Sequence, residues 1–462
     1  MIDENSNTER IAGFIVGAAY KDIPPEAILI AKQGVLDWLG VAIAGASEPV
    51  VAILAQYAKG LAAKGEASGI CQGLMTTAEL ASLINGSMGH ALDFDDTFAN
   101  AARYNIHPTT CILPAALAVV ERLKLSGRDL LLAYVAGMEA TYRIGAAIGQ
   151  SIPAIGWYPT PILGTLGAAA ACAKALQLDA SRARSALGIA SSLASGLKKN
   201  VETMTKTMHA GNAARNGVIA ATLAQGGLTG NQSVLDGKTS FCEVFSGGRA
   251  SPDMMPVDDL GKEWWIISTG LGFKPYPCCR ATHPSIDAIL YLKRRYAIRP
   301  EQVASIISRV NPLVLGMTTA HRPKTAYEAK FSMEYCIAKS IMNGEITMRD
   351  FTDQEVQKAS WQKLIPCIRF EHPAQWGHGA VDLLTEIVIT LNNGETYAHK
   401  VGVPKGEPEN PMSQNELIAK FWQLSGSVFE GSETDELLSI IQGLDRTDGL
   451  ERFFEILRKS PP

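Results

Sequence analysis

Apolar residues recur at helical spacing through most of the first 250 residues. After Pro24 and Pro25 they return every three or four positions as far as Ala42. Proline costs little in a first helical turn, because its missing N–H would be unpaired there anyway. The pattern predicts helices over 25–42, 78–88, 110–123, 130–148, 164–176, 180–193 and 210–224. Many of their apolar positions hold Ala or Gly, so we expect a closely packed helical bundle.

The pattern changes near residue 264, where β-branched runs join the helical ones. Two of these runs flank a turn with Asn-Gly, which is typical of a β-hairpin. The expected strands are 303–310, 385–391 and 395–401, and the expected helices are 284–296, 326–342 and 353–364. A linker rich in Pro, Gly and Glu follows at 404–411, and helices resume at 413–424 and 434–457.

We therefore predict a mainly α protein of two domains. The large all-α domain comprises residues 1–264 and 404–462, with the chain's tail packing back on the first bundle. The smaller α+β lid domain comprises residues 265–403.

Composition excludes several classes of protein. The chain has 462 residues, of which 47% are hydrophobic and 19% charged, and a net charge of −4. Disorder and bulk attraction to nucleic acid or an anionic membrane are therefore not expected. Residues 1–10 lack the pattern of a signal peptide, and the small-residue run 161–176 is too short to span a membrane. None of the eight cysteines forms a CxxC pair, which favours structural thiols in a reducing cytoplasm.

The densest polar cluster lies at 90–97. It holds His90, Asp93, Asp95, Asp96 and Thr97, and His107 follows ten residues later. One interpretation is a solvated acidic loop. The apolar helices and histidines around it favour a chemical role, since three close carboxylates need cations or hydrogen bonds. Asp and His could also bind a divalent metal, but their spacing here fits neither an EF-hand nor a zinc motif. DxDD also occurs in terpene cyclases, but a chain with 7% aromatic residues suits a carbocation cavity poorly.

Two further segments carry basic side chains. Lys206 and His209 lie where a small-residue helix is expected to begin, and a helix N-terminus favours an anion. Prolines make 272–284 a non-helical loop. Its polar residues are Lys274, Cys279, Arg280 and His283, and Arg322 belongs to a basic patch that is expected at the surface.

These motifs, in this order, resemble one family. GHALDFDDT, HP, KTMHAGNAARNG, KPYPCCRATHPSIDA, EAKFSMEY and PKGEPENPMS together look like the MmgE/PrpD family. That family includes 2-methylcitrate dehydratase, cis-aconitate decarboxylase and iminodisuccinate epimerase. The resemblance covers nearly the whole chain. It implies a helical domain built from both chain ends, an α+β lid, a homodimer, and an active site at the domain junction with no metal and no organic cofactor.

The resemblance also implies roles for particular residues. The matching positions are Asp93, Thr97, His107, Lys206 and Lys274. Three positions depart from the family pattern. Tyr158 and Cys279 stand where histidines are common, and Thr319 falls on a tyrosine of the decarboxylase branch. These departures argue against cis-aconitate decarboxylation as the reaction.

The common chemistry is removal of a proton next to a carboxylate. Cationic side chains would neutralise the substrate's carboxylates and stabilise the enolate-like charge. Lys206 and His107 are the candidate bases or acids, with Asp93, Tyr158 and Lys274 as further catalytic candidates. The expected substrate-binding residues are Thr97, His209, Cys279, Arg280, His283, Thr319 and Arg322. A lyase acting on a small di- or tricarboxylate is the first hypothesis. An epimerase or isomerase is the second, and a non-catalytic anion-binding protein is the third.

Overall fold

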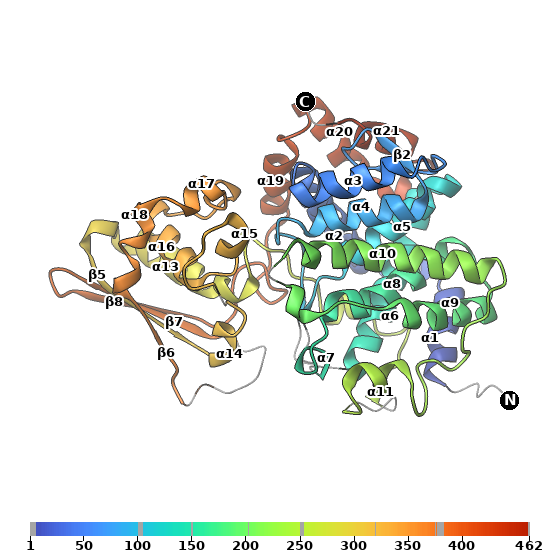
Figure 1. Ribbon diagram of the computed structural model, residues 1–462, viewed down its shortest axis with the longest axis horizontal. Coiled ribbons are helices and arrows are strands. Elements are labelled where there is room, and N and C mark those ends of the chain that lie inside the picture. Colours follow the sequence, from blue (N-terminus) through green and yellow to red (C-terminus); the bar gives the residue numbers. More distant parts are fainter. Residues whose placement is uncertain are drawn as a thin grey trace. The chain divides into compact units, whose positions relative to one another are not determined.

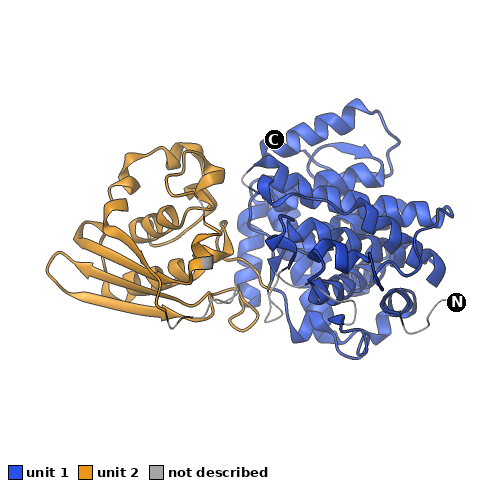
Figure 2. Cartoon of the chain, turned by 60° about the horizontal axis from the view of Figure 1, so that its bottom comes forward, with its two compact units in different colours: residues 1–271, 413–462 blue, residues 272–412 orange. Residues whose placement is uncertain are grey.

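The computed structural model describes residues 6–99, 105–148, 151–201, 203–249, 254–318, 320–374, 376 and 383–460. The chain divides into two compact units (Figure 2). Unit 1 comprises residues 1–271 and 413–462, and unit 2 comprises residues 272–412.

Unit 1 is helical (Figure 1). From the first part of the chain its helices are α1 (Asn7–Gly17), α2 (Pro25–Gly45), α3 (Pro49–Gly60), α4 (Ala78–His90), α5 (Thr109–Leu123), α6 (Gly127–Ile148), α7 (Ser151–Ala154), α8 (Pro159–Ala175), α9 (Ala180–Leu193), α10 (Met204–Gln225), α11 (Phe241–Ser246) and α12 (Trp265–Ser268). The expected helices are confirmed. Two short antiparallel ribbons add to them: β1 (Ala67–Gly69) with β2 (Leu74–Thr76), and β3 (Phe98–Ala99) with β4 (Asn105–Ile106).

The centre of unit 1 is the packing of α10 against α4, α8, α9 and α5. Helices α10 and α4 cross at two glycines. A β-carbon on Gly86 would lie 2.8 Å from the Cα of Gly211, and one on Gly211 would lie 2.0 Å from the carbonyl oxygen of Leu83. No side chain fits there, so the small residues set how closely the two backbones approach. This contact brings the C-terminal end of α4 to the N-terminal turns of α10.

The chain's tail completes unit 1. It forms α19 (Gln414–Ser425), α20 (Gly431–Gln442) and α21 (Glu451–Leu457), and α19 packs against α2 as expected. The predicted capping box is present, since the Ser413 side chain accepts from the Glu416 N–H. Helix α2 is long and apolar enough to cross a membrane, but 78% of that window is buried inside the structure, as in the core helix of a globular domain.

Unit 2 is an α+β unit with a four-stranded sheet in the order β6-β5-β7-β8. Its strands are β5 (Val303–Val310), β6 (Ile368–Glu371), β7 (Thr385–Leu391) and β8 (Thr396–Val401). The predicted hairpin is β7–β8, in which Val388 pairs with Ala398. Its helices are α13 (His283–Tyr296), α14 (Pro312–Leu315), α15 (Ala326–Ala329), α16 (Met333–Asn343), α17 (Asp353–Val356) and α18 (Ala359–Gln362). Helix α13 packs on β7 and β8 (Figure 1), and α16 packs on α13.

The boundaries between the units differ from the expected 264/265 and 403/404. Helix α12 belongs to unit 1, because the Ile266 N–H donates to the buried carboxylate of Glu139, at 2.9 Å. The segment 404–412 belongs to unit 2, because Gly406 accepts from the Phe273 N–H at 2.8 Å. Both boundaries thus depend on hydrogen bonds between segments that are distant in sequence. The local sequence pattern does not predict such bonds.

Some helix limits also differ from expectation. Helix α10 begins at Met204 rather than near His209, because the Thr203 side chain caps it by accepting from the Thr205 N–H. The expected helix over 326–342 is interrupted at residues 330–332, where Ser332 caps α16. The expected helices over 353–364 and 434–457 are divided in the same way.

Candidate functional site

The acidic loop after α4 forms the base of the candidate site. Helix α4 ends at His90, and the Asp93 N–H donates to the His90 carbonyl at 3.3 Å, so the chain turns at once. Asp93 has φ +51°, a left-handed conformation that costs a non-glycine residue about 1 kcal/mol or more. This turn separates the carboxylates, so that Asp93, Asp95 and Asp96 each meet different partners.

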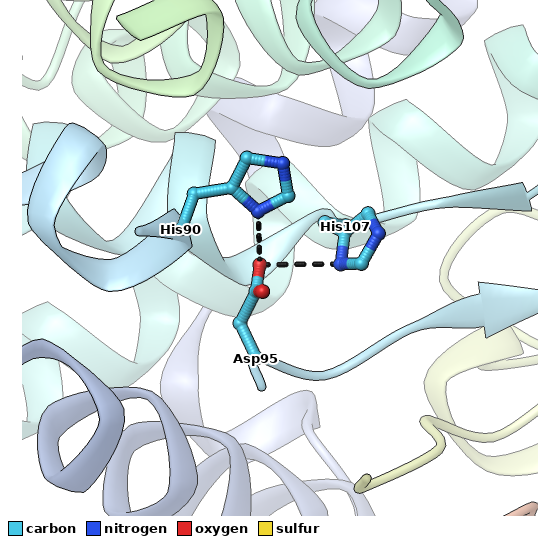
Figure 3. A group of neighbouring side chains, drawn as sticks. All are labelled: His90, Asp95 and His107. Carbon is cyan, nitrogen blue, oxygen red and sulfur yellow. Dashed lines mark hydrogen bonds and ion pairs between the residues drawn. The ribbon is translucent and has the colours of Figure 1, made fainter. Parts of the chain in front are cut away.

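Asp95 lies between two histidines (Figure 3). Its Oδ2 is 2.8 Å from Nδ1 of His90 and 3.2 Å from Nδ1 of His107. The His90 contact is a hydrogen bond, whereas the His107 contact is a close approach of polar atoms that falls short of hydrogen-bond geometry. All three side chains are buried. Burial by itself would raise the pKa of Asp95, but the two imidazoles hold that pKa well below its ordinary value.

His107 is placed by the short ribbon and by α8. Because Phe98 pairs with Ile106, the register sets the buried Thr97 opposite His107. The His107 N–H donates to the Thr160 hydroxyl of α8 at 3.2 Å. The two candidate residues Thr97 and His107 therefore lie side by side.

Tyr158 joins the cluster from the start of α8. Its N–H donates to the Gly196 carbonyl at 2.9 Å, and its hydroxyl lies 3.2 Å from Nε2 of His90. Burial of the phenol raises the pKa of Tyr158 well above its ordinary value, so it stays protonated. Burial also lowers the pKa of His90 from 6.5 to about 4, despite the attraction of Asp95. At neutral pH, His90 is therefore a neutral imidazole next to a neutral phenol.

Lys206 enters from the first turn of α10. Its Nζ is 2.5 Å from Oδ1 of Asp93, and both side chains are buried. His209 is one turn further along, with its ring 6.0 Å from the ring of Tyr158. Burial, and then the charge of Lys206, lower the pKa of His209. Its Nδ1 is buried and has no hydrogen-bond partner among the described residues.

Asp96 points to a different environment from its neighbour. Its Oδ2 accepts from the Thr109 hydroxyl at 2.8 Å, and that hydroxyl contacts the Tyr134 hydroxyl. Burial and the nearby charges of Asp95 and Asp37 raise the pKa of Asp96 well above its ordinary value. The pKa values of two adjacent aspartates thus move in opposite directions, down for Asp95 and up for Asp96.

A lysine from the C-terminal tail contacts the loop that carries the aspartates. Lys420 of α19 donates to Oδ1 of Asp37 at 2.7 Å and to the Phe94 carbonyl at 2.9 Å. Its Nζ also lies 3.8 Å from the centre of the Phe94 ring. A helix more than 300 residues away in sequence therefore fixes the loop that carries the aspartates.

The group His90, Asp95 and His107 has the composition of a metal site. One ligand atom from each lies within 4.8 Å of the others. Ligand atoms around a tetrahedral zinc ion stand about 3.4 Å apart, given bonds of about 2.1 Å. The separation of 2.8 Å between His90 and Asp95 instead matches a direct hydrogen bond. This geometry favours an acid–base cluster over a metal site.

The candidates of unit 2 have partners within that unit. The Arg280 guanidinium forms a buried ion pair with both carboxylate oxygens of Glu407. Its Nη2 donates to Oε2 of Glu407 at 2.6 Å. His283 Nε2 lies 3.2 Å from the Cys278 carbonyl. The Cys279 N–H donates to the Lys330 carbonyl at 2.9 Å, and Lys274 is buried. Arg322 is exposed, and Thr319 lies outside the described residues.

The site therefore combines expected and unexpected residues. Unit 1 brings together the predicted Asp93, Thr97, His107, Tyr158, Lys206 and His209. The sequence analysis placed His90 and Asp95 in the polar cluster but assigned neither of them a role. A signal was present, because a histidine that ends a helix five residues before an aspartate can reach that aspartate across one turn. No sequence pattern around Lys420 or Asp37 predicts that these two residues contact each other.

The fold and the cluster define a class: a mostly helical protein with a buried acid–base centre in its large unit, and a second unit with a small mixed sheet. Comparison with family models gives the particular family. Residues 9–253 match the MmgE/PrpD N-terminal domain and residues 276–446 match the MmgE/PrpD C-terminal domain. The chain belongs to the MmgE/PrpD family, which is a family of enzymes.

Named relatives are similar to this chain over more than nine tenths of their length. The chain is 31% identical to a cis-aconitate decarboxylase of Mus musculus, over 95% of this chain and 91% of the relative. It is 30% identical to the cis-aconitate decarboxylase of Homo sapiens, over 99% of this chain and 96% of the relative. A cis-aconitate decarboxylase of Aspergillus terreus is 28% identical, over 98% of this chain and 97% of the relative.

Proposed function

We propose that this protein is a cofactor-independent lyase that removes a proton next to a carboxylate of a small di- or tricarboxylate. The observation that carries the proposal is the buried ion pair of Lys206 and Asp93 beside the two histidines on Asp95. A cation and several proton-transfer groups in one buried cluster suit a substrate that is anionic and becomes more anionic at carbon during reaction.

In the proposed reaction, a base of the cluster takes the α-proton and the electron pair of the C–H bond forms an enolate-like carboxylate. His107 and Lys206 are the candidates for this step. Lys206 stabilises the developing charge when it is protonated. In a dehydration the electron pair then expels the β-hydroxyl, which leaves as water after a second group protonates it.

The relatives named above act on cis-aconitate by decarboxylation, according to their names. We place dehydration first because Cys279 stands where the decarboxylase branch carries a histidine, and Tyr158 where a histidine is common in the family. A phenol whose pKa is raised by burial is a poor base at neutral pH. Epimerisation uses the same first step and differs only in where the proton returns.

The test follows citrate-like and aconitate-like acids by NMR in D2O with the wild-type protein. We expect the α-proton to exchange for deuterium and a product to form by loss of water. Loss of CO2 would make the enzyme a decarboxylase, and inversion without loss would make it an epimerase. Binding without exchange of any acid would overturn the proposal in favour of an anion-binding protein.

We also propose a homodimer in a reducing, cytoplasmic setting. The resemblance of motifs supports the dimer. Seven of the eight cysteines are buried, all eight are free thiols, and such thiols are stable in a reducing compartment. Analytical ultracentrifugation of the reduced protein tests the dimer, and a sedimentation coefficient of a monomer at all concentrations would contradict it.

A further inference from the structure

Asp95 contacts two imidazoles through one oxygen, and this geometry restricts where protons can lie. Oδ2 is 2.8 Å from Nδ1 of His90 and 3.2 Å from Nδ1 of His107. An ionised carboxylate can only accept hydrogen bonds, so each facing Nδ1 is stable only when it carries the hydrogen.

The hydrogen on Nδ1 also determines the hydrogen-bonding role of Nε2 in each ring. A neutral imidazole with a hydrogen on Nδ1 has a lone pair on Nε2. In His90 that lone pair faces the Tyr158 hydroxyl at 3.2 Å, so Tyr158 must donate to His90. Its hydroxyl proton is then engaged, and the phenol oxygen, which also has a hydrogen bond with the Thr160 side chain, can act toward other groups only as an acceptor.

We propose that Asp95 is a positioning residue that sets the tautomers of His90 and His107 together. Through His107 it keeps an unprotonated Nε2 available as a base. Through His90 it orients the Tyr158 hydroxyl as a hydrogen-bond acceptor toward the site. The tautomer assignment stands on the contacts of both Nδ1 atoms with Oδ2 of an ionised Asp95, and its effect on turnover rests on the proposed function.

The groups around His90 are consistent with this assignment. It faces Asp95, His107, Lys206 and Tyr158, of which Lys206 disfavours a charge on the ring. The rings of His90 and His107 stand 4.6 Å apart at 64°, so both edges reach Asp95 without stacking. The second oxygen of Asp95 is buried and has no hydrogen-bond partner among the described residues. Both contacts between Asp95 and the histidines are therefore made by Oδ2.

Asp96 provides a matched control. It is adjacent in sequence and equally buried, but its pKa is raised and it contacts Thr109 instead of a histidine. Asparagine is close in shape to a protonated aspartic acid. Asp96→Asn should therefore leave both histidines unchanged, whereas Asp95→Asn replaces an obligate acceptor with a group that also donates.

The first test reads the imidazoles without any substrate. Long-range ¹H–¹⁵N NMR of the full-length protein, after treatment with EDTA, distinguishes the tautomers, and His90→Gln and His107→Gln assign the signals. We expect the hydrogen on Nδ1 of both rings in wild type and in Asp96→Asn. At least one ring should change tautomer in Asp95→Asn. Hydrogen on Nε2 of either ring in wild type, or an unchanged Asp95→Asn, would overturn the proposal.

The second test measures deuterium exchange of a substrate found with the wild-type enzyme. By analogy with the aspartate of the serine-protease triad, Asp95→Asn should lower kcat by about 100-fold or more while KM changes little. Asp96→Asn should keep near wild-type kcat. An Asp95→Asn enzyme with full kcat and altered tautomers would limit Asp95 to structure. If no acid exchanges in wild type, the proposed function fails while the tautomer result still stands.

Discussion

The loop at 90–97 in unit 1 and the loop at 274–283 in unit 2 look alike in sequence, since both place several ionisable residues within ten positions. Their surroundings differ. In unit 1 the aspartates meet His90, His107 and Lys206, and so form a connected acid–base cluster. In unit 2 Arg280 is bound on both arms by Glu407. A charged motif therefore joins a cluster of several ionisable groups or a single ion pair according to the partners that the fold supplies.

The largest expected effect is on activity in unit 1. Lys206→Ala should lower the rate of α-proton exchange by about 10³-fold or more, because the cation and proton-transfer group are lost together. Lys199→Ala, at an exposed lysine of the same segment, is the matched control and should retain full activity. Near-native exchange in Lys206→Ala would remove this lysine from the mechanism.

Lys206→Ala also leaves Asp93 buried without its cation, which can destabilise the fold. The double variant Lys206→Ala/Asp93→Asn removes that charge. Circular dichroism should show a folded double variant that is equally inactive. An active double variant would show that Lys206 serves only to neutralise Asp93 and takes no part in the reaction.

The next effect is on stability in unit 2. Arg280→Ala leaves Glu407 as an uncompensated buried charge, and the free energy of unfolding should fall by about 3–5 kcal/mol. Arg309→Ala, which breaks partly exposed pairs with Glu371 and Glu386, should cost about 1 kcal/mol or less. Urea denaturation measures both. A stable Arg280→Ala protein with a raised KM would instead make Arg280 a substrate ligand.

Tyr158→Phe should give an intermediate effect. The change removes the hydroxyl that faces His90 Nε2, at a cost of about 1–3 kcal/mol, or roughly 10- to 100-fold in kcat. Tyr158→His adds a titrating group and should shift the pH–rate profile toward neutral. Unchanged kinetics in Tyr158→Phe would mean that the ring only packs, and that specificity lies elsewhere.

Asp96→Asn should stabilise the protein in a pH-dependent way. A carboxyl with a raised folded pKa contributes stability that is complete below its unfolded pKa and is lost as the pH rises toward the folded value. The neutral asparagine avoids that loss. The difference in unfolding free energy between variant and wild type should grow by about 1.4 kcal/mol per pH unit above pH ~4. A constant difference from pH 4 to 7 would show that Asp96 is ionised.

The smallest expected effect is that of a chelator. Dialysis against EDTA should leave the exchange rate unchanged, because the 2.8 Å separation of His90 and Asp95 fits a hydrogen bond. Loss of activity that Mg²⁺, Mn²⁺ or Zn²⁺ restores would assign a metal to His90, Asp95 and His107.

The sequence by itself determined the main elements and the motifs. Helical periodicity located most helices of unit 1, and the Asn-Gly turn located the β7–β8 hairpin, because both are set by local backbone and side-chain preferences. The strand β6 was not foreseen, since four residues are too few for a clear alternation. The order of the motifs indicated the family and hence Asp93, His107 and Lys206.

Only the tertiary structure decided what each charged group does. Asp95 and Asp96 are identical and adjacent in sequence, but the first faces His90 and His107 while the second faces Thr109. Burial raises the pKa of both carboxyls, but the two imidazoles hold the pKa of Asp95 below its ordinary value, whereas the charges of Asp95 and Asp37 raise that of Asp96 further. Protonation depends on burial and on neighbours that come from distant segments, and a linear pattern contains neither.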